Sequence, residues 1–307
     1  MFDYDAVIIG GGPAGLTAGI YLGRARRRTI LLDKESFGGY IKNIDRIENY
    51  PGFGQGISGP QLASEMVAQA TKYELKLKQA QVTGIELFSS SRYVTCADGN
   101  GFTTAVVIIA GGSRPKKLGV AGEDLLRGKG VFDCALCDGG QFESRVVVVC
   151  GGGEAALTEA LYMSKLASKV IVIHRRDQLR AARVLQEKAM AEPKIEFVWN
   201  SLVEAIEGKD VVEGVKIRNT ASGQVTSLKT DGVLVQVGLE PDTGYLQGII
   251  PLDSQGQVIV NEKMETEVPY IFAAGNIRSG SPRQVATAVG DGAIAAISAE
   301  SALQELA

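Results

Sequence analysis

Two cysteines separated by two residues, Cys134 and Cys137, are followed directly by a carboxylate, Asp138. Thiols at this spacing can cycle between a dithiol and a disulfide while a neighbouring acid supplies or accepts a proton. The segment therefore predicts redox chemistry, with these three side chains as its catalytic residues. Such chemistry needs a source of electrons elsewhere in the chain.

Two other interpretations of the cysteine pair are open. A zinc site would need further ligands, but Cys96, Cys150 and the single histidine, His174, do not repeat the tight spacing of a second ligand pair. Two inert buried thiols are also conceivable, because free cysteine is among the most buried residue types. That interpretation explains neither the adjacent Asp138 nor the glycines that follow it. The redox interpretation is favoured, and Cys96 and Cys150 are expected in the core.

A glycine-rich fingerprint follows the first apolar run. Residues 5–9 read as a buried strand, Gly10 to Gly15 match Gly-x-Gly-x-x-Gly, and an apolar-periodic helix begins there. In this motif the first glycine permits a tight turn, the second admits a pyrophosphate, and the third lets helix and strand pack closely. The next strand, 29–32, ends in Asp33, which is placed to bind a ribose 2′-hydroxyl. The order of these elements predicts a dinucleotide site.

The same pattern begins again in the middle of the chain. A strand at 145–150 leads to Gly151-x-Gly153-x-x-Ala156 and then to a helix at 157–167. The second strand, 169–173, ends in His174-Arg175-Arg176 instead of an acid. Three cationic side chains suit a 2′-phosphate, so this site is expected to prefer NADPH to NADH. A solvated basic turn is the alternative.

The repeat indicates two domains of one architecture. Val233 to Pro241 matches Val107 to Pro115 in its strand, glycine and proline, and the sequence changes character at 116–122. The chain after about 245 has no fingerprint of its own, so it is expected to complete the first domain. The long irregular segment 36–60 is expected to cover a cofactor. A helix is expected from Gln61 to Tyr73, and a meander of short strands from about Leu75 to Thr104.

The composition fits a compact α/β protein. The 307 residues are long enough for two domains, and 45% of them are hydrophobic and 38 are glycine. The net charge of −3 gives no basic surface for nucleic acid. No basic and apolar leader opens the chain, and no apolar run approaches the ~20 residues that cross a bilayer. A cytoplasmic protein without nucleic-acid or membrane partners is expected.

In the order of these motifs the chain resembles the low-molecular-weight thioredoxin reductases of the prokaryotic type, over nearly its whole length. The resemblance also uses Gly38-Gly39, Asn49-Tyr50-Pro51-Gly52, Gly275 and Arg283-Gln284. It implies FAD in the first site, NADPH in the second, thioredoxin as partner and a homodimer. It also implies two Rossmann-like domains of three ββα layers, with an NADPH domain (117–242) inserted into a split FAD domain (1–116 and 243–307).

The resemblance also assigns residues to each step. Hydride would pass from NADPH to the flavin, which would reduce the Cys134–Cys137 disulfide. Cys137 would lie next to the flavin, Cys134 would attack the disulfide of the partner, and Asp138 would be the general acid and base. The NADPH domain would rotate about linkers near Lys116 and Asp242. The residues expected to bind FAD are Gly10, Gly12, Pro13, Ala14, Gly15, Asp33, Gly39, Tyr40, Asn49, Val82, Gly112, Gly275, Asn276, Arg283, Gln284 and Val285. Those expected to bind NADPH are Gly151, Gly153, Glu154, Ala155, His174, Arg175, Arg176 and Arg180.

Three positions depart from the pattern of this family. Tyr40 replaces a common glutamine, Asn276 replaces an aspartate, and Asp133 replaces an aromatic residue. The added negative charge of Asp133 is expected to raise the pKa of Cys134. The alternative functions are a related flavoprotein with ferredoxin as electron donor or another protein disulfide as substrate, and a flavin redox sensor. The basic cluster at 174–176 argues against ferredoxin.

Overall fold

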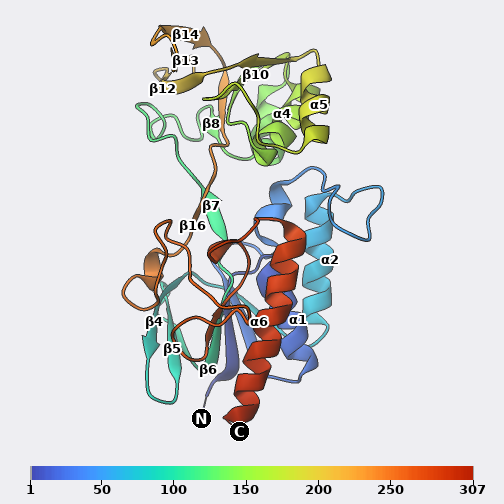
Figure 1. The fold of residues 1–307 in the computed structure, drawn as a ribbon, viewed down its shortest axis with the longest axis vertical. Coiled ribbons are helices and arrows are strands. Elements are labelled where there is room, and N and C mark those ends of the chain that lie inside the picture. The colour runs from blue at the N-terminus through green and yellow to red at the C-terminus, as the bar shows by residue number, and fades with distance from the viewer. Residues whose placement is uncertain (1, 307) are drawn as a thin grey trace. The chain divides into compact units, whose positions relative to one another are not determined.

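The computed structural model describes residues 2–306, which divide into two compact units (Figure 1). One unit comprises residues 2–42, 46–114 and 240–306, and the other comprises residues 43–45 and 115–239. The second unit is thus an insertion in the chain of the first.

One seven-stranded sheet forms the centre of the first unit, in the order β3-β2-β1-β6-β5-β4, with β17 paired to β6. Strands β3, β2, β1, β6 and β17 run parallel, whereas β5 and β4 form an antiparallel extension. Val7 of β1 lies between Ile30 and Val107 on the neighbouring strands. The strands are β1 (Tyr4–Ile9), β2 (Thr29–Asp33), β3 (Lys76–Gln79), β4 (Val82–Leu87), β5 (Arg92–Cys96), β6 (Gly101–Ile109) and β17 (Ile271–Ala273).

Both faces of the parallel strands are covered, so the buried stretches 6–9 of β1 and 105–109 of β6 are apolar runs that do not alternate with polar residues. Helices α1 (Pro13–Arg24), α2 (Gly59–Thr71) and α6 (Val285–Glu305) lie together on one side of the sheet (Figure 1). On the other side, Val7 and Ile9 pack in a core with residues of the β4–β5 hairpin and of the segment 246–258. The unit therefore has three layers.

Short elements connect these layers and carry the chain out of the unit. Strands β7 (Ser113–Pro115) and β16 (Leu239–Pro241) pair as a small two-stranded sheet. There Arg114 Nε lies 2.8 Å from Glu240 Oε1. The chain therefore leaves the first unit and returns to it at neighbouring points. The 3₁₀ helices are η1 (Gly39–Asn43), η3 (Gly244–Leu246) and η4 (Gly275–Ile277).

The second unit repeats this architecture. Its parallel sheet has the order β11-β10-β9-β15-β8, and a separate antiparallel sheet has the order β12-β13-β14. The strands are β8 (Val131–Phe132), β9 (Val146–Cys150), β10 (Lys169–Ile173), β11 (Ile195–Val198), β12 (Ser201–Glu207), β13 (Gly214–Asn219), β14 (Val225–Lys229) and β15 (Gly232–Val235).

Helices and the antiparallel sheet cover opposite faces of this parallel sheet. Helix α4 (Glu154–Leu166) and helix α5 (Arg183–Ala191) pack over Val147 and Val149, while Val148 faces Val203 and Val215 of the antiparallel sheet. The redox segment forms α3 (Ala135–Asp138) and the 3₁₀ helix η2 (Gly139–Phe142). The predicted α/β class with two three-layer Rossmann-like domains is confirmed.

Three predicted boundaries differ from the structure. Helix α4 begins at Glu154, because Gly153 has the extended backbone of an N-cap. Helix α2 begins at Gly59, because the Ser58 side chain accepts the N–H of Gln61. Strand β3 pairs parallel with β2 and is not the start of the predicted meander. A capping residue sets where each of the two helices begins, and a pairing with a strand distant in the sequence sets the place of β3; local hydrophobicity reports neither.

Candidate active site and cofactor sites

The two predicted redox cysteines form a disulfide at the start of α3. Cys134 is the N-cap residue of this short helix, and its Sγ accepts the N–H of Cys137 at 3.1 Å. A four-residue turn thus holds both sulfurs, with a Cα–Cα distance of 5.4 Å. Asp138 follows at the end of the turn, as the sequence predicts.

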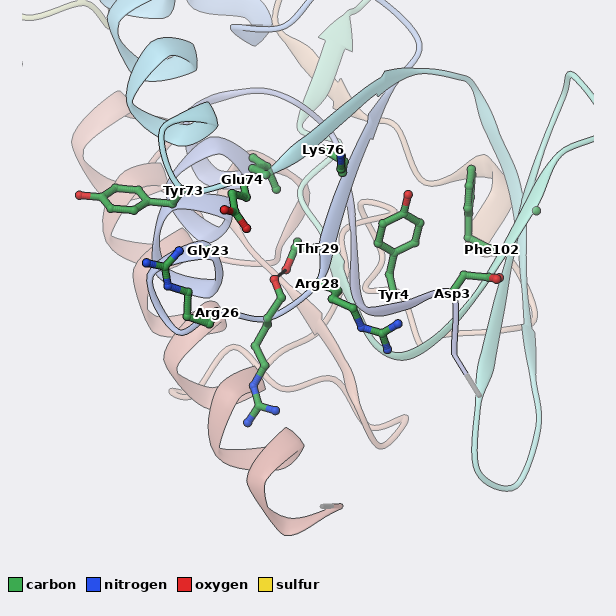
Figure 2. Close-up of a pocket in the computed structure, with 13 residues that line it drawn as sticks. Asp3, Tyr4, Gly23, Arg26, Arg28, Thr29, Tyr73, Glu74, Lys76 and Phe102 are labelled. Carbon is green, nitrogen blue, oxygen red and sulfur yellow. Dashed lines mark hydrogen bonds between the residues drawn. The ribbon is translucent and has the colours of Figure 1, made fainter.

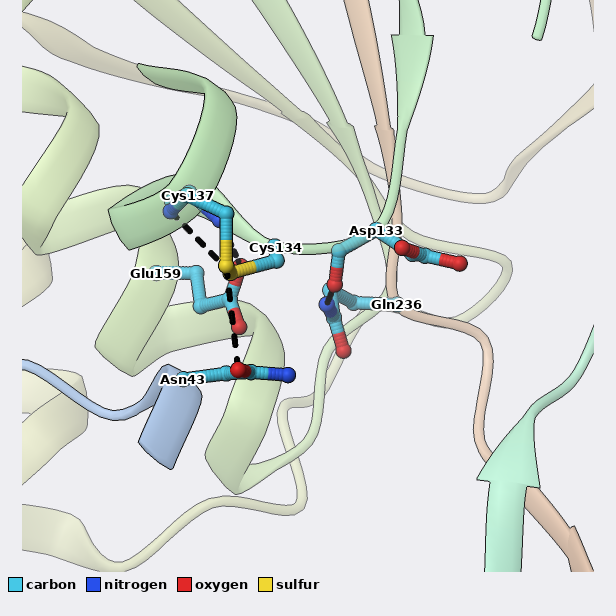
Figure 3. Close-up of a disulfide and its surroundings, with 7 residues drawn as sticks. Asn43, Asp133, Cys134, Cys137, Glu159 and Gln236 are labelled. Carbon is cyan, nitrogen blue, oxygen red and sulfur yellow. Dashed lines mark hydrogen bonds between the residues drawn. A yellow bond between two sulfur atoms is a disulfide. The ribbon is translucent and has the colours of Figure 1, made fainter. Parts of the chain in front are cut away.

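Two side chains that the sequence did not single out hold the backbone beside Cys134 (Figure 3). The N–H of Ala135 donates to Glu159 Oε2 of α4 at 2.8 Å, and Gln236 Nε2 donates to the carbonyl oxygen of Asp133 at 2.8 Å. The Gln236 amide also lies close enough to the Glu159 carboxylate to lower the pKa of that group. One signal was available: Glu159 interrupts the apolar stripe of α4, between Ala156 and Met163.

Two carboxyl groups near the disulfide, those of Glu159 and Asp138, have raised pKa values. Burial raises the pKa of Glu159 to about 7, although the hydrogen bond from Ala135 opposes this. Burial, and then the charge of Asp133, raise the pKa of Asp138. Asp133 itself lies 2.9 Å from Arg127 Nη1, which offsets part of its charge. The predicted effect of Asp133 on Cys134 stays a prediction.

The first glycine turn joins β1 to α1. Gly10 has φ +109°, and a Cβ there would lie 2.3 Å from the Ala110 carbonyl oxygen. At Gly15 a Cβ would lie 1.9 Å from the Gly10 carbonyl oxygen. Gly12 differs, because the nearest described atom to a Cβ there is the Cα of Gly39 at 3.7 Å. The backbone of the turn is thus packed at Gly10 and Gly15 and open at Gly12.

Other predicted FAD residues lie around this turn. The Asp33 carboxylate at the end of β2 accepts the N–H of Gly11 at 2.6 Å, so it braces the turn. Gly39 has φ +66°, and a Cβ there would lie 2.6 Å from the Cα of Gly12. Ala14, which follows Pro13 in α1, lies 3.0 Å from where a Cβ on Gly275 would be. Segments distant in the sequence therefore meet at this turn.

The start of α6 brings further predicted residues together. Asn49 Nδ2 donates to Gln284 Oε1 at 3.0 Å, directly before Val285. Asp291, which the sequence analysis missed, accepts the N–H of Gly275 at 3.1 Å and pairs with Arg278 at 2.6 Å. It is a buried acid in a helix of small residues, and that contrast is the signal that could have identified it.

The remaining predicted FAD residues also lie in the first unit. Tyr40 follows Gly39 in η1, and Val82 opens β4 shortly after Ala80, whose N–H donates to the Asp33 carbonyl oxygen at 2.7 Å. The Asn276 carbonyl oxygen accepts the hydroxyl of Ser113 at 3.3 Å. The last two predicted FAD-binding residues have a positive φ: Gly112 at +65° and the exposed Arg283 at +59°.

These residues fit a bound dinucleotide. The open face of Gly12 at the N-terminus of α1 leaves its amides accessible to a pyrophosphate. The buried hydroxyl of Tyr245 has no hydrogen-bond partner within residues 2–306, and it lies 3.8 Å from where a Cβ on Gly111 would be. A buried hydroxyl without a partner is costly, so a polar ligand atom beside it would stabilise the site.

The second glycine turn joins β9 to α4 in the same way. Gly151 has φ +147°, and a Cβ there would lie 2.3 Å from the Gln236 carbonyl oxygen. At Gly153 the described structure has no atom within 4 Å of such a Cβ. Glu154 and Ala155 open α4, and the Glu154 carboxylate accepts the N–H of Ala182 at 2.9 Å. An open glycine at a helix N-terminus again fits a pyrophosphate.

His174 departs from the prediction. Its ring is buried against Gly152, and its Nε2 lies 3.1 Å from the carbonyl oxygen of Gln178. Burial lowers the pKa of His174, and the neighbouring arginines lower it further. The predicted cationic histidine is therefore neutral at pH 7, because burial outweighs the hydrogen bond that favours its charged form.

The positive charge at this turn comes from Arg175, Arg176 and Arg180, which are exposed. The N–H of Arg180 donates to the Gly152 carbonyl oxygen at 2.8 Å, which ties the basic loop to the glycine turn. Trp199 approaches the His174 ring edge-on at a centroid distance of 6.5 Å. These contacts place the basic side chains beside the open glycine turn.

A groove of about 730 Å³ lies elsewhere in the first unit (Figure 2). Tyr4, Thr29, Lys76 and Phe102 line it at the amino ends of their strands. Ligands in open α/β sheets bind at the opposite, carboxyl ends, where the glycine turns lie. Two arginines of the groove are also neutralised, Arg27 by Glu300 and Arg28 by Asp5. The groove is therefore not the candidate site.

Residues 2–306 contain no helix that is long and apolar enough to cross a membrane. Within the same residues, no group of three or more histidine, cysteine or acidic side chains is arranged to hold a metal ion.

Comparison with known proteins agrees with this geometry. The family model described as pyridine nucleotide-disulphide oxidoreductase matches residues 4–292. Thioredoxin reductase of Listeria monocytogenes is 40% identical over 306 residues, which cover 99% of this chain and 95% of that protein. The crystal structure of Lactococcus lactis thioredoxin reductase in its FR conformation has a TM-score of 0.96 at 38% identity, over 99% of this chain and 100% of that one.

The chain belongs to the pyridine nucleotide-disulphide oxidoreductase family. Thioredoxin reductase of Bacillus subtilis, at 40% identity over 99% of this chain and 96% of its own, belongs to the same group of relatives. The predicted resemblance to the low-molecular-weight thioredoxin reductases is thereby confirmed.

Proposed function

We propose that the chain is an FAD-dependent NADPH:thioredoxin-disulfide reductase. The observation that carries this proposal is one disulfide followed by an acid, in a chain with two open glycine turns, the second of which is bordered by the exposed Arg175, Arg176 and Arg180. When bound, FAD accepts a hydride from NADPH and delivers two electrons to a disulfide. The chain's own residues bind the two nucleotides and carry out the exchange of sulfurs.

The exchange uses three residues of the redox segment. The thiolate of Cys134 attacks one sulfur of the thioredoxin disulfide, which gives a mixed disulfide and one thioredoxin thiolate. The thiolate of Cys137 then attacks the Cys134 sulfur, restores the Cys134–Cys137 disulfide and releases the second thioredoxin thiolate. The raised pKa of Asp138 keeps this carboxyl able to donate a proton to a leaving thiolate at higher pH than an ordinary aspartate.

The division of binding roles follows the two turns. The first unit, predicted as residues 1–116 and 243–307, binds FAD, and residues 117–242 bind NADPH. Arg175, Arg176 and Arg180 contact the 2′-phosphate, while neutral His174 supports the Gly152 turn. The predicted site residues of both units belong to this proposal. So do the cytoplasmic location and the homodimer, for which Ile294 and Ile297 offer exposed apolar area on α6.

The experiment is an anaerobic titration of the purified flavoprotein with NADPH and with NADH, which follows bleaching of the flavin absorbance band. NADPH is expected to bleach it at far lower concentration than NADH, and oxidised thioredoxin is expected to restore it. Replacing either Arg175 or Arg176 alone by alanine should raise the KM for NADPH by about 10- to 100-fold, since one arginine–phosphate contact contributes about 1.5–3 kcal/mol. The KM for NADH should change little.

Two results would contradict the proposal. If neither nucleotide bleaches the flavin, a ferredoxin-linked enzyme or a flavin redox sensor becomes the better account. If NADPH bleaches it but thioredoxin does not restore the band, another protein disulfide is the substrate. A Cys137→Ser variant tests the order of the thiols, because it should accumulate the mixed disulfide through Cys134.

A further inference from the structure

The backbone is held on both sides of Cys134, and the two contacts come from different parts of the second unit. Before the cysteine, the carbonyl oxygen of Asp133 accepts Gln236 Nε2 at 2.8 Å. After it, the N–H of Ala135 donates to Glu159 Oε2 at 2.8 Å. Gln236 directly follows β15, and Glu159 lies on α4, so the sheet and its covering helix each supply one contact.

The two side chains also lie near each other, since the Gln236 amide lowers the pKa of Glu159. Nitrogen is the only donor atom of a glutamine side chain, and it carries two protons. Gln236 uses one for the Asp133 carbonyl oxygen. Glu159 is 6% exposed, so these hydrogen bonds lie out of water, where loss of one leaves a costly unpaired group. Two neighbouring side chains therefore hold the backbone at residue 133 and at residue 135.

This arrangement has a consequence for the sulfur of Cys134. Its position depends on the backbone of residues 133–135, because only one carbon separates Sγ from the Cα. The disulfide itself fixes Sγ while it is oxidised, but the bond is absent in the reduced protein. A support that does not depend on the disulfide would keep the two sulfurs close in both states, and thiols held close together have a high effective concentration.

We infer that Glu159 and Gln236 are positioning residues for the redox pair: together they fix the backbone on both sides of Cys134, so that its sulfur keeps the geometry for exchange when the disulfide is open (Figure 3). The inference rests on the proposed thiol–disulfide exchange and adds two residues to it. Neither side chain is assigned a chemical step.

The test uses Glu159→Ala and Gln236→Ala in the full-length flavoprotein. The first readout is the equilibrium constant for forming the Cys134–Cys137 disulfide with oxidised glutathione. Free thiols are alkylated at equilibrium, and mass spectrometry then gives the fractions of the dithiol and disulfide forms. Loss of positioning should lower this constant by about tenfold in each variant. In the double variant this equilibrium constant should be at most about twofold lower than in either single variant, because both residues hold the same backbone segment and their effects are not additive.

The second readout is turnover with thioredoxin. The value of kcat should fall by about 10- to 100-fold while flavin reduction by NADPH keeps its rate. Glu159→Gln retains an acceptor oxygen for the Ala135 N–H, so it should recover both readouts to within about threefold of the unmodified protein. Asp231→Ala is the matched control, because this carboxylate accepts the N–H of Val146 at 2.9 Å in the same unit but away from the cysteines.

The inference is overturned if both alanine variants keep the glutathione constant and kcat within twofold, even when their unfolding temperatures fall as in the control. If Glu159→Ala does not fold, Gln236→Ala decides alone. The glutathione measurement needs neither NADPH nor thioredoxin. If the protein fails to reduce thioredoxin, the proposed function is contradicted, but the glutathione measurement still tests the positioning role of Glu159 and Gln236.

Discussion

Glu159 combines a structural contact with an unusual charge. An exposed glutamate titrates near 4.3, whereas burial raises the pKa of Glu159 to about 7 in the folded chain. The fold therefore favours the protonated form, and the carboxyl can serve as an acceptor for Ala135 in either form. In the basic loop burial shifts a pKa in the other direction, because it lowers the pKa of His174 and so keeps the imidazole neutral. At both sites the desolvation of a single side chain decides its charge near neutral pH.

The raised pKa of Glu159 predicts how stability depends on pH. A group whose pKa is higher in the folded state contributes its full stability below the unfolded pKa, and this contribution is lost as pH rises through the folded pKa. For Glu159 the window runs from about 4.5 to about 7. Urea unfolding of the oxidised protein should show that the free energy of unfolding, relative to Glu159→Gln, falls by roughly 3 kcal/mol between pH 5 and pH 8. An equal difference at both pH values would contradict the assignment.

At the scale of the element, α6 depends on close approach to α1. A Cβ on Gly292 would lie 2.2 Å from the carbonyl oxygen of Ala14, which is backbone and cannot move aside. Two residues earlier on the same helix, Gly290 is exposed, and the described residues place no atom within 4 Å of its Cβ position. Ala14 also opens α1 beside the first glycine turn. The packing of the two helices thus sets the position of residues that bind FAD.

These two glycines make a matched pair. Gly292→Ala should destabilise the protein by at least about 2 kcal/mol, because the helix must shift away from α1. Gly290→Ala should stabilise it by about 0.5–1 kcal/mol, since alanine is the better helix former and nothing opposes its methyl group. Urea unfolding curves measure both. If both substitutions leave the free energy of unfolding unchanged, the close contact between Gly292 of α6 and Ala14 of α1 is contradicted.

Local patterns predicted the elements well, and distant pairings less well. A strand, a glycine turn and a helix are close in sequence, so both nucleotide turns were predicted from residues 5–15 and 145–156. The place of β17 beside β6, the parallel pairing of β3 and the contact of Asn49 with Gln284 depend on residues far apart in the chain. No periodicity reports such contacts, because a single sequence shows neighbours along the chain only.

The same limit applies to the candidate site. Cys134, Cys137 and the glycines were predicted because their types and spacing are unusual in themselves. Glu159, Gln236, Asp291 and Tyr245 are ordinary residues whose importance comes from the backbone groups or open space beside them in the fold. The charge of His174 was predicted wrongly for a related reason, since burial cannot be read from its neighbours in sequence.

At the scale of the whole molecule, the chain contains two separately cored units. The second has its own parallel sheet, its own helices and hydrophobic cores on both faces of that sheet. The two ends of its main segment, residues 115–239, join the first unit through β7 and β16, where Arg114 meets Glu240. Because these ends are neighbours, removing the insertion leaves only a short gap to close.

A fragment of residues 115–239 should therefore fold alone and unfold cooperatively in urea, since a domain with its own core can fold independently. It should also form the Cys134–Cys137 disulfide. The complementary protein, with a short glycine–serine linker joining residues 114 and 240, should still bind FAD. Circular dichroism and flavin absorbance measure these outcomes. A fragment without a cooperative transition would show that the inserted unit depends on the rest of the chain.

Trp199 is the only tryptophan in the sequence, and it stacks on Phe197 while its edge meets the buried ring of His174. His174 in turn packs on Gly152 in the second glycine turn. The protein thus carries its single indole beside one nucleotide site, while the other unit has no tryptophan. Emission from this indole reports on the basic loop directly, without a dye and without replacing any residue, so occupancy of that loop can be followed in the native protein in real time.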